Sequence, residues 1–146
     1  MDIVTIILNA ANAAKVSGIL LLGICTHESG NFKLNYSVYD NGSPSYGVCQ
    51  VKLDTAARLG FKGSPKDLND PRINSKYAAL YLKYQEQRYG DNWVKLASAY
   101  NAGSYNPSNR VPGCPRNLRY IKLVKKKLPE SLQNRLTCGS NGVAEK

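Results

Sequence analysis

Residues 19–30 read ILLLGICTHESG, and this stretch decides the fold of the chain around it. The run from Ile19 to Cys25 is almost wholly apolar, and its surroundings are rich in Leu and Ala without a predominance of β-branched residues. This composition favours a buried helix, with a buried strand as the alternative. Gly30 is a helix stop, so Glu28 is expected at the end of the predicted helix.

Helical periodicity continues on both sides of this stretch. Helices are predicted over residues 3–14, 54–59, 73–89, 93–102 (capped by Asp91 or Asn92) and 116–128, with a loop through Pro65 and Pro71 and a short last helix from Pro129 to about Leu136. The segment from Asn31 to Gly47 is rich in Asn, Ser, Tyr, Gly and Pro, which predicts an irregular stretch or a small hairpin. Asn41-Gly42 is its strongest turn signal. The whole pattern predicts a mainly helical protein.

The length of 146 residues predicts one domain, over residues 1–138, followed by a flexible tail over 139–146. An apolar fraction of 42% with 21% charged residues excludes collagen-like, mucin-like and wholly disordered proteins. Polar residues interrupt the apolar opening, so no transmembrane segment is expected. Asp2 stands where a secretory signal has basic residues. Export by another route and prior removal of a signal are the two alternatives.

Lys and Arg number 20 against 10 Asp and Glu, a net charge of +10. This excess favours a polyanionic partner, which is nucleic acid, anionic lipid or the bacterial cell wall. The one dense group, here called the basic cluster, consists of Lys122, Lys125, Lys126 and Lys127. No aromatic residue is interleaved in it, so specific nucleic-acid binding is not expected.

The four cysteines do not follow the C-x-x-C spacing of a zinc site, and we expect neither a metal nor a cofactor. Cys114 and Cys138 bracket the predicted basic helix and are the best candidates for a disulfide in an oxidising compartment. Four buried thiols, with Cys25 and Cys49 included, are the alternative.

Glu28 is the residue that most suggests chemistry. It closes an apolar helix with Ile24 one turn behind it, where desolvation raises the pKa of a carboxyl group. A carboxylic acid that stays protonated near neutral pH is the general acid that glycosidic bond cleavage requires. A solvated glutamate at a helix end is the alternative interpretation.

Three sequence blocks give Glu28 a context. They are Glu28-Ser29, Ser45-Tyr46-Gly47-Val48-Cys49-Gln50-Val51 and Ala99-Tyr100-Asn101-Ala102-Gly103. With the run from Asn69 to Asn74, these blocks closely resemble the soluble lytic transglycosylase family, whose signatures are an E-S pair, a G-L-M-Q block and an A-Y-N-x-G block. The resemblance covers roughly residues 19–120. It implies a mainly α, α+β lysozyme-like fold of the goose-lysozyme kind, with at most a small β-hairpin beside the active-site groove.

The resemblance also implies an activity. The family cuts the β-1,4 bond between N-acetylmuramic acid and N-acetylglucosamine in peptidoglycan, and one glutamate, here Glu28, performs both proton transfers. The expected product is a 1,6-anhydro sugar formed without water. Peptidoglycan glycan strands and the anionic cell-wall surface are then the partners of a monomeric enzyme acting in the periplasm or outside the cell. The short layout is similar to phage lysis enzymes and to small transglycosylases of secretion systems.

By the same resemblance, seven residues are expected to contact substrate. They are Ser29, Ser45, Tyr46, Gln50, Tyr100, Asn101 and Tyr120. Ser29 has a helix-end cap as its alternative role, and Asn101 has a tie to the loop beyond it. Cys49 replaces the methionine of the G-L-M-Q block and is expected at the groove floor. Arg116 stands where the family usually has a glutamate, four residues before Tyr120.

Two other functions stay open. A goose-type-lysozyme-like hydrolase needs a second carboxylate to activate water, and Asp40 is the candidate. Asp54 is better explained as an N-terminal helix cap. A catalytically inactive wall-binding or assembly component is the alternative from another class.

Overall fold

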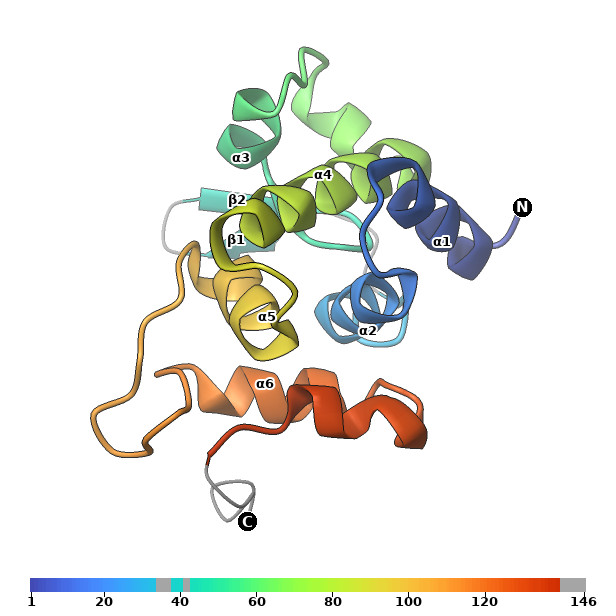
Figure 1. Cartoon of the computed structure of the whole chain (residues 1–146). Helices are drawn as coiled ribbons and strands as arrows, with labels where there is room; N and C mark the ends of the chain where they lie inside the picture. The colour runs from blue at the N-terminus through green and yellow to red at the C-terminus, as the bar shows by residue number, and fades with distance from the viewer. Residues whose placement is uncertain (34–37, 41–42, 140–146) are drawn as a thin grey trace. The chain divides into compact units, whose positions relative to one another are not determined.

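The computed structural model describes residues 1–33, 38–40 and 43–139, with only the backbone described for 38–40 and 43. Most of these residues are helical, which confirms the predicted fold class (Figure 1). The chain divides into two compact units, residues 1–84 and residues 85–146, and each is described by itself. The single domain over 1–138 stays a prediction, and the predicted flexibility of 140–146 lies outside the described residues. In the described part no helix has the length and apolar character needed to cross a bilayer.

The first unit begins with two packed helices, α1 (Ile3–Ala14) and α2 (Gly18–Glu28). The Asp2 carboxylate caps α1 by accepting the Thr5 N–H at 2.8 Å. The Ser17 hydroxyl caps α2. A Cβ atom on Gly18 would lie 2.9 Å from the end of the Leu8 side chain, so a larger residue there would make Leu8 shift. The apolar stretch that begins at Ile19 is therefore a buried helix, as predicted.

A small antiparallel sheet follows, in the order β1 (Val38–Asp40), β2 (Ser43–Tyr46) and β3 (Val51–Lys52). Asp40 pairs with Ser43, so β1 and β2 form the predicted hairpin, while the Asn41-Gly42 turn signal itself lies outside the described residues. The two-residue strand β3 adds a third strand to it.

The rest of the first unit corrects two predictions. The helix α3 (Leu53–Arg58) begins before Asp54, whose carboxylate accepts the Thr55 N–H and pairs with Arg58 at 3.4 Å, so Asp54 is not the helix cap. The predicted loop contains a 3-10 helix, η1 (Pro65–Asn69), which the Asp67 carboxylate stabilises by accepting the Ser64 N–H at 2.9 Å. The long helix α4 (Pro71–Tyr89) starts at a proline, which is favoured at the first helical position, and its residues from Gln85 onward belong to the second unit.

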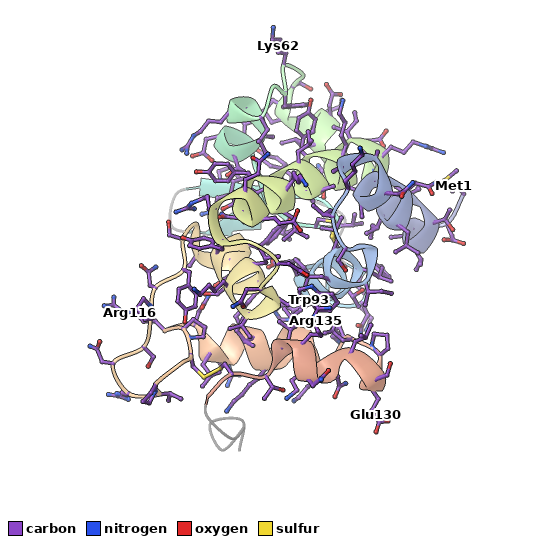
Figure 2. The ribbon with its side chains drawn as sticks, in the orientation of Figure 1. Met1, Lys62, Trp93, Arg116, Glu130 and Arg135 are labelled. Carbon is purple, nitrogen blue, oxygen red and sulfur yellow. A yellow bond between two sulfur atoms is a disulfide. The ribbon has the colours of Figure 1, made fainter. Side chains whose placement is uncertain are left out.

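The second unit contains α5 (Trp93–Ala102), α6 (Leu118–Lys125) and the 3-10 helix η2 (Glu130–Leu136). The Asn92 side chain caps α5 by accepting the Lys95 N–H at 3.1 Å, which selects Asn92 over Asp91. The Arg135 guanidinium of η2 lies 4.2 Å from the centroid of the Trp93 ring, a cation–π contact between η2 and α5 (Figure 2).

Helix α6 is shorter than the predicted span of 116–128 because its flanks are held by tertiary contacts. The Arg116 N–H donates to the Asn106 carbonyl at 2.8 Å, and Pro107 pairs with Pro115 in an isolated bridge. These contacts hold the chain outside the helix before Asn117, the N-cap, and α6 begins at Leu118.

All four cysteines, each within the described part, form disulfides. Cys114–Cys138 is the predicted pair, and Cys25–Cys49 is a second disulfide that was not predicted. The alternative of four buried thiols is wrong, and Cys49 is a buried structural link instead of an apolar groove-floor residue. Each disulfide joins cysteines 24 residues apart, and loops of this length contribute about 3–4 kcal/mol in the chain-entropy model.

Candidate active site

Glu28 is the last residue of α2, and its side chain is half-buried. The chain turns sharply after it, because residues 30–32 all have positive φ values of 59°, 63° and 68°. Such a run is uncommon for residues other than glycine, and strained backbone of this kind tends to occur at functional sites. The turn ends the helix abruptly and places Glu28 at its corner.

Ser29 stabilises this turn from inside. Its side chain is fully buried, its hydroxyl donates to the Cys25 carbonyl at 2.8 Å, and its oxygen accepts the Phe32 N–H at 2.8 Å. The single hydroxyl proton is used within the helix end. The structure therefore supports the capping role for Ser29, and its contact with substrate stays a prediction.

Gln50 lies in the turn that joins β2 to β3. Its backbone has a φ of 50°, and its side-chain Nε2 donates to the Gly47 carbonyl at 2.7 Å. Part of the hydrogen-bonding capacity of Gln50 is therefore used to shape its own turn. The side chain is half-buried, so Gln50 stays a candidate for substrate contact.

Ser45 and Tyr46 are neighbours on β2 and are both half-buried. Ser45 pairs with Val38 and Lys52, and Tyr46 pairs with Val51. Because successive side chains of a strand point to opposite faces, these two side chains lie on opposite faces of the sheet. They are therefore not expected to contact the same sugar as a pair.

A disulfide brings Glu28 and Gln50 into one neighbourhood. Cys25 precedes Glu28 by three residues and Cys49 immediately precedes Gln50, and the Cα atoms of the two cysteines are 4.2 Å apart. Helix rise and Cα spacing then place the Cα atoms of Glu28 and Gln50 within about 13 Å of each other.

Asn74 is a site-supporting residue that the sequence reasoning missed. Its fully buried side chain accepts the Cys49 N–H at 2.8 Å and donates to the carbonyls of Tyr46 at 2.6 Å and Leu68 at 2.7 Å. The only sequence signal was its place at the end of the run from Asn69 to Asn74. The pattern of that run does not reveal which backbone groups the amide binds.

Asp40, the candidate second carboxylate, is the last residue of β1 and pairs with Ser43 through the backbone. Its side chain lies outside the described residues, so its role stays a prediction. Within residues 1–33, 38–40 and 43–139, no three His, Cys, Asp or Glu side chains gather as metal ligands.

The second unit carries Tyr100, Asn101 and Tyr120. Tyr100 on α5 and Tyr120 on α6 are buried, and the two helices pack against each other. Asn101 is exposed, and its Oδ1 accepts a hydrogen bond from the Asn117 side chain at 2.9 Å. Asn117 also exchanges hydrogen bonds with Ser98. Asn101 thus ties the end of α5 to the residue that precedes α6, and its contact with substrate stays a prediction.

Gln85 and Arg88, near the end of α4, also bind the C-terminal end of α5. The buried Gln85 amide donates to the carbonyls of Ala99 at 3.3 Å and Gly103 at 3.0 Å. Arg88 donates to the Gly103 carbonyl at 2.7 Å and to the Ser104 hydroxyl at 2.8 Å. These contacts were not predicted, because they join residues that are distant in sequence.

Arg116 is exposed and lies before α6, not within it. Glu28 and Gln50 belong to the first unit, whereas Tyr100, Asn101 and Tyr120 belong to the second. Assembly of both sets into one site stays a prediction.

Both the sequence and the fold of the chain are similar to those of known proteins. The transglycosylase SLT domain family matches residues 5–111. Protein IpgF of Shigella sonnei and protein IpgF of Shigella flexneri are each 34% identical to the chain over 87 residues, which are 58% of this chain and 57% of the relative. The chain thus spans just over half the length of these curated relatives.

Among solved structures, an inactive mutant of lytic transglycosylase Slt from Pseudomonas aeruginosa is similar in fold. The TM-score is 0.58 at 16% sequence identity, over 90% of this chain and 22% of that chain. At this identity the likeness shows the fold alone.

Proposed function

The chain belongs to the transglycosylase SLT domain family, and from this premise we propose that it is a peptidoglycan lytic transglycosylase. The bond cleaved is the β-1,4 bond between N-acetylmuramic acid and N-acetylglucosamine. The observation that carries the proposal is the position of Glu28. This residue is half-buried at the end of α2, just before backbone with positive φ values, and the Cys25–Cys49 disulfide links the turn that carries Gln50 to the same helix.

Glu28 acts in both halves of the reaction. The protonated carboxyl donates its proton to the glycosidic oxygen, which leaves with the electron pair of the C1–O bond. The resulting carboxylate then takes the proton of the muramoyl 6-hydroxyl as that oxygen bonds to C1. The products are a 1,6-anhydro-muramoyl end and a free 4-hydroxyl, and Glu28 is protonated again. The first step needs the carboxyl of Glu28 in its protonated form.

The other expected residues bind the glycan. We assign Gln50 and one of Ser45 and Tyr46, in the first unit, to contact with the glycan. Tyr100, Asn101 and Tyr120, in the second unit, are further candidates for glycan contact. In this assignment Ser29 acts on Glu28 through the turn and does not touch the sugar.

The cell wall as the place of action is supported by two features. Two disulfides are typical of proteins that work in an oxidising compartment, such as the periplasm or the exterior. Residues 85–146 contain 11 of the 20 Lys and Arg but only 4 of the 10 Asp and Glu, and this excess attracts an anionic wall surface. A role in phage lysis or in wall penetration is part of the same proposal.

The test is mass spectrometry of purified peptidoglycan after digestion. We expect fragments with anhydro-muramoyl ends, lighter than the hydrated fragments by one water. Glu28→Gln should abolish nearly all cleavage while the circular dichroism spectrum stays that of the wild type. Glu130→Gln, on an exposed glutamate of η2, is the matched control and should cleave normally. Hydrated reducing ends alone would instead identify a hydrolase and direct attention to Asp40.

A further inference from the structure

The turn that carries Gln50 has a strained backbone. Residues 47–50 join β2 to β3, and Gly47 and Gln50 have positive φ values of 75° and 50°. Residues other than glycine adopt this region only when the surrounding structure imposes it. The position of Gln50 therefore depends on contacts from outside the turn.

The first such contact is the Asn74 side chain, which lies in the first turn of α4 and is completely buried. It binds the chain on either side of Gly47, through the Tyr46 carbonyl at 2.6 Å and the Cys49 N–H at 2.8 Å. A Cβ atom on Gly47 would lie 2.5 Å from the Asn74 amide nitrogen, so the amide fills the space beside the glycine. Asn74 thus holds the turn against η1 and α4.

The second contact is the Cys25–Cys49 disulfide. Both cysteines are buried, and Cys49 is also the residue whose N–H binds Asn74. Helix positions three apart lie on the same side, so Cys25 and Glu28 project from one face of α2. The disulfide therefore attaches the turn to the face of α2 that presents the acid.

We propose that Asn74 and the Cys25–Cys49 disulfide are positioning elements that set the placement of Gln50 relative to Glu28, an inference that rests on the proposed transglycosylase function. Cys49 is the shared anchor, held through its sulfur by α2 and through its N–H by α4. Neither element touches the glycan. They affect the rate by setting the positions of Glu28 and Gln50, the two side chains that contact the glycan in this proposal.

The test uses the second disulfide of the chain as a matched control. Cys25→Ala/Cys49→Ala removes the link at the site, and Cys114→Ala/Cys138→Ala removes the link in the second unit. Both disulfides join cysteines 24 residues apart, so their removal relaxes the unfolded chain equally. Initial rates on soluble peptidoglycan glycan strands give kcat and KM, and near-ultraviolet circular dichroism verifies folding. We expect kcat to fall about 10- to 100-fold in the first variant and less than about 3-fold in the second.

Two further variants keep the inference testable if the first disulfide variant does not fold. Asn74→Asp retains an acceptor for the Cys49 N–H but loses the donors to the Tyr46 and Leu68 carbonyls, and it should lower kcat more than it raises KM. When Asn74→Asp or the disulfide removal is combined with Gln50→Ala in a double-mutant cycle, each should lower kcat little further than Gln50→Ala alone does. If these variants instead lost activity through a general loss of stability, their fold-losses in kcat would multiply with that of Gln50→Ala.

The outcomes separate this inference from the function on which it rests. A folded wild-type protein that releases no anhydro-muramoyl product refutes the proposed function itself. An active wild type whose two disulfide variants lose kcat equally, or whose losses multiply in the Gln50→Ala background, overturns the positioning role alone.

Discussion

Ser29→Ala distinguishes a hydroxyl that shapes the active-site turn from one that contacts substrate. The side chain is completely buried and takes part in two hydrogen bonds of 2.8 Å, one to the Cys25 carbonyl and one from the Phe32 N–H. The Cys25 carbonyl keeps the bond from the Ser29 N–H at 3.0 Å, but the Phe32 N–H loses its hydroxyl acceptor. Leaving a partly buried donor unpaired costs about 1–3 kcal/mol, so we expect a loss of about 2 kcal/mol in the free energy of unfolding.

For a chain of this length such a loss lowers Tm by about 6–8 °C. Urea unfolding and thermal scans measure the loss, and Ser131→Ala, at an exposed serine of η2, is the control that should change neither. Below Tm the variant should bind glycan with an unchanged KM and a lowered kcat, because the turn after Glu28 is looser. A change in stability below about 0.5 kcal/mol together with a raised KM would refute the capping role and restore Ser29 as a substrate contact.

Three further predictions concern stability and charge. Gly47→Ala should destabilise the protein by at least about 1–3 kcal/mol in urea unfolding, because the new methyl group meets Asn74 at 2.5 Å and the φ of 75° disfavours alanine; a neutral result would contradict the tight packing. Reversing the charge of Lys122, Lys126 and Lys127 should slow the clearance of cell walls at low salt but not at high salt, since screening removes the attraction. Lys125, the fourth residue of the basic cluster, is left in place because its ammonium donates a hydrogen bond to the Thr137 hydroxyl. The pKa of Asp2 is lowered because its carboxylate accepts the Thr5 N–H, so its cap stabilises the fold above the unfolded-state pKa and is lost as the pH falls through the lower folded-state pKa. Asp2→Asn should therefore weaken the dependence of Tm on pH at acidic pH, and an unchanged acid profile would speak against that cap.

Local signals were sufficient for the helices whose ends are set by nearby residues. The predicted spans of α1 and α5 agree with the structure because an amphipathic period and a side-chain cap, Asp2 or Asn92, act within a few residues. The prediction of α6 was too long because Arg116 and its neighbours bind a loop about ten residues earlier. The 3-10 helix η1 was missed because the prolines of its segment also fit a loop.

The sequence by itself determined that the chain is mainly helical and that an apolar helix ends at Glu28. Only the tertiary structure decided what holds the acid in place. The pairing of Cys25 with Cys49 and the hydrogen bonds of Asn74 to Tyr46 and Cys49 join groups whose proximity depends on how α2, the β2–β3 turn and α4 pack. Periodicity and capping act over one or two helical turns, whereas these contacts form only when packing brings distant residues within bonding distance.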